Sequence, residues 1–177
     1  DDRVGRRVEV DDIHVTRSTL VRTAGDAMDE RRRLGCRLDG HDLIRLDIGA
    51  EAGADVVCSA RSLDEVQAVA DEVRALGRRA LAVACDVNDA EQRQALVRQS
   101  IEHMGRLTHL VNNVGGGGPN DPLTLSPEQF AQVLNFNVAT SYAFCQLCVP
   151  LMREAGGGNI INISSVAARY AQRHFSA

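Results

Sequence analysis

The sequence predicts an α/β protein with a doubly wound, incomplete parallel sheet. From residue 50 onward, short apolar runs of strand length alternate with amphipathic segments of helical length. The apolar runs show little polar alternation, as expected for strands that are buried on both faces. Right-handed crossovers between such strands place helices on both sides of the sheet. Four strands can be identified in this way.

The first unit begins with a strand at residues 54–60. Ser62 and Glu65 have the spacing of a capping box, which predicts a helix start at this point. Gly77 supplies a left-handed residue at the helix end. Between them, an apolar stripe at helical spacing predicts a helix packed on the sheet: Leu63, Val66, Val69, Val73 and Leu76.

The second unit repeats this arrangement. A strand at 80–84 precedes Asn88 and Glu91, which again have capping-box spacing, and Gly105 closes the helix. A third strand follows at 107–112.

The third unit contains a glycine-rich loop and a long helical region. Gly115–Gly118 and Pro119 predict a loop, and Ser126-Pro127 predicts a helix start. Helix is expected from there to about Glu154, with a break near 135–137, followed by a strand at 159–163 that ends at Ser164-Ser165.

Residues 1–48 have a different composition. Of these 48 residues 21 are charged, against 23 of the remaining 129, and no period of 2 or 3.6 is sustained. Such a segment buries little apolar area, so we expect it to be disordered or loosely attached. Its excess of Arg and Asp, which stops abruptly where the regular pattern begins, also raises the hypothesis that it is out of frame or scrambled. Leu43–Ile48 is its best candidate strand.

Composition excludes several classes of function. The net charge of −4 and the 3% aromatic content argue against a nucleic-acid partner. No apolar run is long enough to span a bilayer, and five cysteines without small-scaffold spacing favour reduced thiols in the cytoplasm, with no metal site. The CxxC pair, Cys145 and Cys148, is expected to pack within a helix.

Ligands of an open parallel sheet bind beyond the carboxyl ends of its strands. Each predicted strand here ends in a polar or glycine signal: Arg61-Ser62, Asp86-Val87, Asn113 with Gly115–Gly118, and Ser164-Ser165. Together they predict a binding site at that edge.

These motifs, in this order and spacing, resemble the short-chain dehydrogenase/reductase family. Asp86-Val87 matches the pair after the third strand of that family, and Asn112-Asn113-Val114-Gly115 matches its Asn-Asn-Ala-Gly motif with Val in place of Ala. Asn137 matches the Asn of the following helix, and Ser165 matches the catalytic Ser. The resemblance implies a partial Rossmann-like domain at residues 49–177.

The resemblance also implies residue roles. Asp86 would accept a hydrogen bond from the adenine amino group, the Val87 amide would contact the ring edge, and Asn113 and Gly115 would lie near the adenosine ribose. Ser165 would hydrogen-bond the substrate oxygen, and Asn137 would hold a water in the proton relay. Alternatively, Ser165 caps a loop and Asn137 only breaks the helix.

The end of the second strand of the family bears on cofactor preference. A carboxylate there binds the ribose 2′-hydroxyl of NAD, whereas an Arg accommodates the 2′-phosphate of NADP. This chain has Ala60 followed by Arg61, which favours NADP(H) and leaves NAD(H) open.

Two features of the family are not visible. The glycine-rich phosphate turn should fall near residues 35–42, where only two glycines stand at the wrong spacing. The Tyr of Tyr-x-x-x-Lys would fall at position 178, after Ala177, and all 20 basic residues are Arg. Tyr170 and His174 copy the spacing but lie too close to Ser165.

The resemblance therefore implies an oxidoreductase that transfers hydride between NADP(H) and a small carbonyl or secondary alcohol, and the two missing features lead us to expect no activity from these 177 residues. The alternative is a non-catalytic Rossmann-like subunit that acts through an interface. In either case, the helix at 137–154 is the expected homo-oligomer face. Substrate identity and reaction direction are not encoded in these residues.

Overall fold

A computed structural model describes residues 16–18, 50, 54–116, 121–165 and 169. The described elements alternate between strands and helices, as predicted. In chain order they are β1 (Thr16–Ser18), β2 (Val56–Ala60), α3 (Leu63–Ala75), β3 (Ala80–Ala84), α4 (Ala90–Met104), β4 (His109–Asn112), α5 (Pro127–Leu134), the π-helix η1 (Asn135–Ala139), α6 (Thr140–Glu154) and β5 (Asn159–Asn162).

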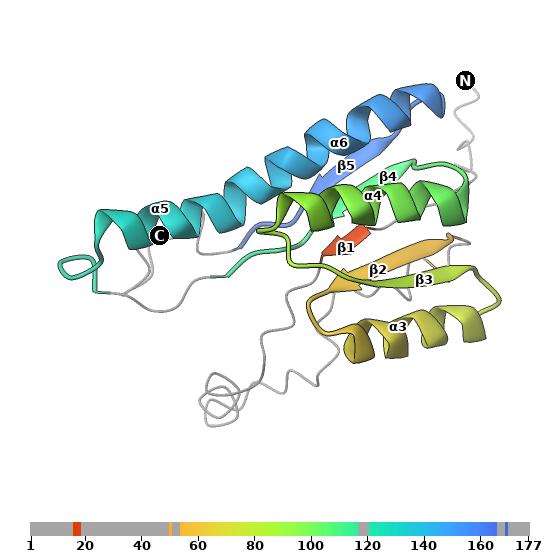
Figure 1. The fold of residues 1–177 in the computed structure, drawn as a ribbon, viewed down its shortest axis with the longest axis horizontal. Coiled ribbons are helices and arrows are strands. Elements are labelled where there is room, and N and C mark those ends of the chain that lie inside the picture. The colour runs from red at the N-terminus through yellow and green to blue at the C-terminus, as the bar shows by residue number, and fades with distance from the viewer. Residues whose placement is uncertain (1–15, 19–49, 51–53, 117–120, 166–168, 170–177) are drawn as a thin grey trace, which may run out of the picture.

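All paired strands are parallel. β2 pairs with β3 from Val56↔Ala80 to Ala60↔Ala84, and β4 pairs with β5 from His109↔Asn159 to Asn112↔Asn162. β1 pairs with β2 and lies between β2 and β4 (Figure 1). The strands pair as two sets, β1-β2-β3 and β4-β5, and β1 lies beside β4. The resulting spatial order 3-2-1-4-5, in which the chain moves outward first on one side of β1 and then on the other, is the topology of a doubly wound sheet.

Helices cover both sides of the strands, so the predicted fold class is confirmed. α3 lies on one side, and α4 and α6 lie together on the other (Figure 1). The α3 side buries one cluster that includes Val56, Cys58 and Val73. The other side buries a larger cluster that includes Val57, Leu96 and Phe144. Val56 and Val57 are neighbours in the chain, and they enter opposite clusters because successive strand residues face opposite sides.

Two helix starts differ from the prediction. Ser62 is the N-cap of α3, but its side chain makes no capping hydrogen bond. At α4 the N-cap is Asp89 and not Asn88, and the Asp89 carboxylate accepts from the backbone N–H groups of Glu91 and Gln92. An ionised carboxylate suits the positive end of a helix better than an amide does. The expected helix ends are confirmed, since Gly77 and Gly105 have φ of 78° and 85°.

The long helical region has the predicted interruption. Ser126 forms a complete capping box with Gln129, and Pro127 occupies the first turn of α5. The break expected near 135–137 is the π-helix η1, a widened turn that joins α5 to α6 without a gap. Such a turn displaces side chains from regular helical positions, which is frequent at functional sites.

Burial of the strands is uneven. All five residues of β2 are buried, whereas all four residues of β5 are exposed. The expectation of strands buried on both faces is therefore wrong for β5. The physical reason is that none of the described helices packs extensively on β5, so its side chains stay exposed.

The charged N-terminal segment is mostly outside the described residues. This applies to the predicted strand Leu43–Ile48, to residues 35–42, and to Tyr170 and His174 at the other end of the chain. β1 is described, and no sequence pattern predicted it.

Candidate functional site at the carboxyl edge of the strands

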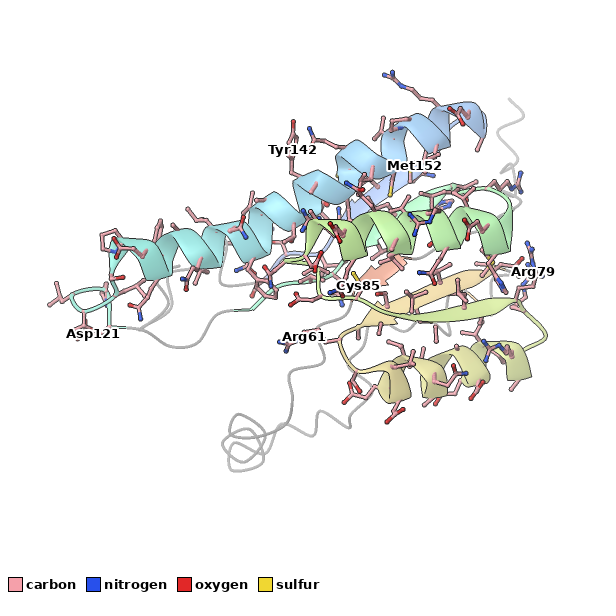
Figure 2. All side chains as sticks on the ribbon, in the orientation of Figure 1. Arg61, Arg79, Cys85, Asp121, Tyr142 and Met152 are labelled. Carbon is pink, nitrogen blue, oxygen red and sulfur yellow. The ribbon has the colours of Figure 1, made fainter. Side chains whose placement is uncertain are left out.

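Hydrogen bonds beyond the strands connect their carboxyl ends in pairs. The Cys85 N–H donates to the Ala60 carbonyl at 2.8 Å, which joins the end of β3 to the end of β2. The Ile163 N–H donates to the Asn112 carbonyl at 2.9 Å, which joins β5 to β4. Figure 2 shows Arg61 and Cys85 at one end of the β2–β3 pair and Arg79 at the other. The predicted site residues therefore fall into two groups, one on each strand pair.

The first group is the turn between β3 and α4. Asp86 is half-buried, and its Oδ1 accepts from the Asn88 backbone N–H at 3.0 Å and from Asn88 Nδ2 at 3.1 Å. Val87 is 5% exposed, and within the described residues its backbone N–H makes no hydrogen bond. Backbone N–H groups of buried residues almost always have an acceptor. Among the described residues, the turn thus has one backbone donor without a partner, next to a carboxylate.

The Cys85 thiol lies at the same strand end but is unsuited to nucleophilic chemistry. Burial, together with the negative charge of Asp86, raises its pKa to about 11. Because the thiolate is the reactive form, this cysteine stays protonated and inert at neutral pH.

The second group brings Asn137 and the loop after β4 together. Asn137 Oδ1 accepts from the Gly116 N–H at 2.8 Å, and Asn137 Nδ2 donates to the Gly116 carbonyl at 2.9 Å and to the Val133 carbonyl at 2.9 Å. A Cβ on Gly115 would lie 2.9 Å from Asn137 Oδ1. Glycine at this position therefore permits the close approach of the loop to η1.

Sequence reasoning missed a pair of amides behind this loop. Asn112 is 4% exposed, and its Nδ2 donates to Asn162 Oδ1 at 2.8 Å, across the ends of β4 and β5. The two residues are register partners. Asparagine at the last position of two apolar strands was the available signal. The pair fixes the end of β4 relative to the end of β5. Asn113 follows directly after β4, and Ser165 follows three residues after Asn162 at the end of β5.

The remaining predicted residues lie where the strands end. Arg61 is exposed directly after β2, Asn113 is half-buried directly after β4, and Ser165 is exposed after β5. Within the part of the chain that the structure describes, no ion pair joins Arg61 to Asp86. The structure thus brings Gly115 and Asn137 into contact, and it leaves Arg61 and Ser165 on the surface of the same set of strand ends.

A shallow groove lies next to the turn after β3. It is lined by Asn88, Ala131, Gln132, Asn135 and Phe136. Asn88 belongs to the turn after β3, and Asn135 and Phe136 belong to η1, which also holds the loop after β4. The groove thus lies between the turn after β3 and the α5–η1 segment, and none of the predicted site residues lines it.

Other chemistry is limited in the described ranges. No group of three or more His, Cys, Asp or Glu side chains could hold a metal ion there, and no helix among them has the length and apolarity to cross a membrane. Cys148 is fully buried in the core cluster on α6, and burial raises its pKa to about 12. The expectation that this cysteine packs within a helix is confirmed.

Comparisons of the sequence and of the structure with known proteins find the same kind of relatives. The chain is 46% identical to an uncharacterized oxidoreductase of Mycobacterium tuberculosis over 72% of its own length and 49% of that protein. It is 39% identical to the 7α-hydroxysteroid dehydrogenase of Escherichia coli over 67% of its length and 46% of that protein. The chain thus spans about half the length of the curated relatives it matches.

Solved structures agree with these relatives. A 7α-hydroxysteroid dehydrogenase complexed with NADH and 7-oxo glycochenodeoxycholic acid matches with a TM-score of 0.67 and 37% identity, over 71% of this chain and 49% of that one. A short chain dehydrogenase from Mycobacterium smegmatis matches with a TM-score of 0.66 and 35% identity, over 71% and 53%. Residues 47–177 match the family described as short chain dehydrogenase. The chain therefore belongs to the short-chain dehydrogenase/reductase family of oxidoreductases.

Proposed function

We propose that this chain carries the adenosine-binding half of an oxidoreductase that transfers hydride between NADP(H) and a small carbonyl compound or secondary alcohol. The observation that carries the proposal is that the turns after β3 and β4 both lie at the carboxyl ends of parallel strands. One turn offers the Asp86 carboxylate and the Val87 N–H, and the other offers Asn113 and Gly115.

The residues present fit the adenine base of a dinucleotide. The Val87 N–H, which has no partner among the described residues, and the Asp86 carboxylate form a donor and acceptor pair that complements the N1 and amino group of adenine. When bound, the cofactor supplies the hydride. The role of this chain is to bind and orient its adenosine end.

Arg61 supports NADP(H) over NAD(H) within this proposal. Its side chain is exposed at the end of β2, with no acidic residue at Ala60, so a 2′-phosphate placed there would meet a cation. The structure of the related 7α-hydroxysteroid dehydrogenase was solved with NADH, so binding of NADPH has to be compared with binding of NADH.

Ser165 and Asn137 are the proposed catalytic residues of this chain, as the substrate-oxygen donor and as part of a proton relay. The substrates in the name and title of the relatives make a hydroxysteroid or its ketone the first class to assay. The rest of the catalytic machinery is not assigned to any residue here.

NADPH binding tests the proposal directly. Titration with NADPH and NADH, followed by nicotinamide fluorescence and by thermal melting, should give tighter binding of NADPH. Arg61→Leu should reduce NADPH affinity about tenfold, the equivalent of one phosphate contact, and leave NADH affinity unchanged. Absence of binding for both cofactors would refute the proposal.

A non-catalytic subunit is the second candidate. Exposed apolar side chains on α5, η1 and α6 favour it, namely Leu134 (46% exposed), Val138 (60%) and Tyr142 (64%). The 177 residues contain no Lys, so they cannot by themselves supply the Tyr-x-x-x-Lys pair of the family. A chain that binds neither cofactor yet associates with a family member would support this candidate.

A further inference from the structure

The turn that contains Asp86 and Val87 is held by side chains from the start of α4. Gln92 Oε1 accepts a hydrogen bond from the Asp86 backbone N–H at 2.8 Å. Arg93 donates from Nη1 to the Val87 carbonyl. Gln92 is itself held, because its Nε2 donates to Asp89 Oδ2 at 3.1 Å.

These contacts account for the backbone polar groups of the two residues with one exception. The Asp86 N–H is bonded to Gln92, the Asp86 carbonyl accepts from the Asp89 N–H at 3.0 Å, and the Val87 carbonyl accepts from Arg93. In the described part of the chain, only the Val87 N–H is left without a partner. The peptide groups on both sides of it are therefore fixed, and it is the one backbone group of the two residues whose partner is left to be supplied.

The position of Arg93 lowers the stability of the fold in one respect. It is half-buried, and its Nε is buried with no hydrogen-bond partner among the described residues. An unpaired buried donor destabilises a fold. Arg98, five residues later on the same helix, instead lies exposed beside Glu102, with Arg98 Nε 3.9 Å from Glu102 Oε1. Arg93 is thus directed at the turn after β3, whereas Arg98 is directed along the helix surface.

We infer that Gln92 and Arg93 are positioning residues that make the Asp86–Val87 turn selective for adenine. The inference rests on the proposed function. Neither residue needs to touch the cofactor. Gln92 holds the Asp86 N–H and Arg93 holds the Val87 carbonyl. Together these bonds fix the direction of the Val87 N–H and the position of the Asp86 carboxylate.

Hypoxanthine is the base that tests this geometry. It carries a carbonyl oxygen where adenine has the amino group, and a protonated N1 where adenine has an acceptor. Against a fixed turn, its oxygen would face the Asp86 carboxylate and its N1–H would face the Val87 N–H. A site built on specific hydrogen bonds rejects such a ligand more strongly than a loosely held site does. The remainder of the dinucleotide is identical, so the ratio of the two affinities isolates the base.

The experiment compares NADPH with its deamino (hypoxanthine) analogue. Dissociation constants are measured for the unchanged chain, Gln92→Leu, Arg93→Leu, Arg93→Lys and the control Arg98→Leu, at a temperature well below each melting point. The unchanged chain and Arg98→Leu should prefer NADPH about tenfold. Gln92→Leu and Arg93→Leu should bring the ratio towards one, chiefly by weakening NADPH. Arg93→Lys, which keeps a donor near the Val87 carbonyl, should retain part of the preference for NADPH over the deamino analogue.

The outcomes separate the inference from the proposed function. If the unchanged chain binds neither dinucleotide, the proposed function fails and the inference falls with it. If the chain binds both equally, or if both leucine variants keep the original ratio, the inference alone is overturned. Equal loss of both ligands in those variants would also overturn it, because a purely structural role predicts that result.

Discussion

Gly115 lies where the loop after β4 meets η1, and its missing side chain is a packing requirement. A Cβ there would sit 2.9 Å from Asn137 Oδ1, whereas a Cβ on Gly116 would meet its nearest atom, in the Phe136 ring, at 3.8 Å. The first distance forces Asn137 to move, and the second is ordinary contact. Two adjacent glycines therefore carry different constraints.

Gly115→Ala should lower the free energy of unfolding by about 1–2 kcal/mol, since displacing Asn137 breaks at least one of its bonds to Gly116. Gly116→Ala should cost less than about 0.5 kcal/mol. Urea unfolding of both variants measures the difference. Equal costs would contradict the contact between Gly115 and Asn137.

Asp55 anchors the opposite, amino edge of the strands. It is 4% exposed and accepts from the Arg79 N–H at 2.9 Å, and its carboxylate oxygens lie 2.6 Å from Arg79 Nε and 3.1 Å from Arg78 Nη2. Burial acts to raise the pKa of Asp55, but the hydrogen bonds from Arg79 and the charges of both arginines outweigh burial and hold the pKa below 3.8.

A carboxyl whose pKa is lowered by folding stabilises the fold above its unfolded pKa. That contribution is present at neutral pH and is lost as the pH falls below 3.8 towards the folded pKa. Asp55→Asn should therefore cost about 2 kcal/mol at pH 7, and the cost should shrink in acid. Urea unfolding from pH 7 to pH 3 measures it.

Asp71→Asn is the matched control, because Asp71 pairs with Arg74 on the surface, with 61% of its side chain exposed. Such a pair contributes less than about 1 kcal/mol. A cost of Asp55→Asn that does not change with pH would contradict the role of the charge.

At the level of elements, two serines that look alike in the sequence start their helices differently. Ser126 Oγ accepts from the Gln129 N–H at 3.2 Å, and Gln129 Oε1 accepts from the Ser126 N–H at 2.9 Å. Ser62 has the matching spacing to Glu65 but makes no capping bond. The three-residue spacing between the serine and the Gln or Glu therefore does not by itself determine which capping box forms.

Ser126→Ala should destabilise the protein by about 1 kcal/mol, because it leaves a helix N–H without its acceptor. Ser62→Ala should change the free energy of unfolding by less than about 0.3 kcal/mol, as expected for a surface substitution. Denaturant unfolding compares the two. A larger loss for Ser62→Ala would contradict the observed caps.

Strands and helices between residues 54 and 162 were predictable because their apolar periods are local. The strand at 80–84 has the predicted bounds, and the interruption at 135–137 falls within η1. The exposure of β5 was not predictable, since Ile160 and Ile161 read as core residues until the strand order is known. β1 depends on pairing with β2 rather than on its own three residues.

For the whole molecule, the direction of the strands decided what could be foreseen of the site. Parallel strands bring their carboxyl ends to one edge, so the order of motifs was enough to predict that Asp86, Asn113 and Ser165 follow strand ends. That they share one site stays a prediction. The contacts of Gln92 and Arg93 could not be foreseen, because they depend on how α4 turns after β3. The Asn137 contact with Gly116 likewise depends on the widened turn of η1.

The exposed side chains of α5, η1 and α6 form the surface on which we expect two copies to associate. Tyr142 points away from the body of the molecule, while Met152 is buried against it (Figure 2). Val138→Arg should weaken self-association at least about tenfold, because it places a charge in an apolar contact. Gln99→Arg, an exposed change on α4, is the control. Sedimentation velocity over a range of concentrations measures both.

If Val138→Arg associates as the unchanged chain does, this surface is not the interface.

The central claim is that the turns after β3 and β4 form one adenosine site. An NMR titration of the ¹⁵N-labelled chain with NADPH tests it most directly. If the two turns form one site, the amide signals of Val87, Asn113 and Gly115 should shift together with one dissociation constant, while those of Arg79 and Thr108 at the opposite edge should stay in place. Shifts confined to one of the two turns, or centred on the opposite edge, would contradict it.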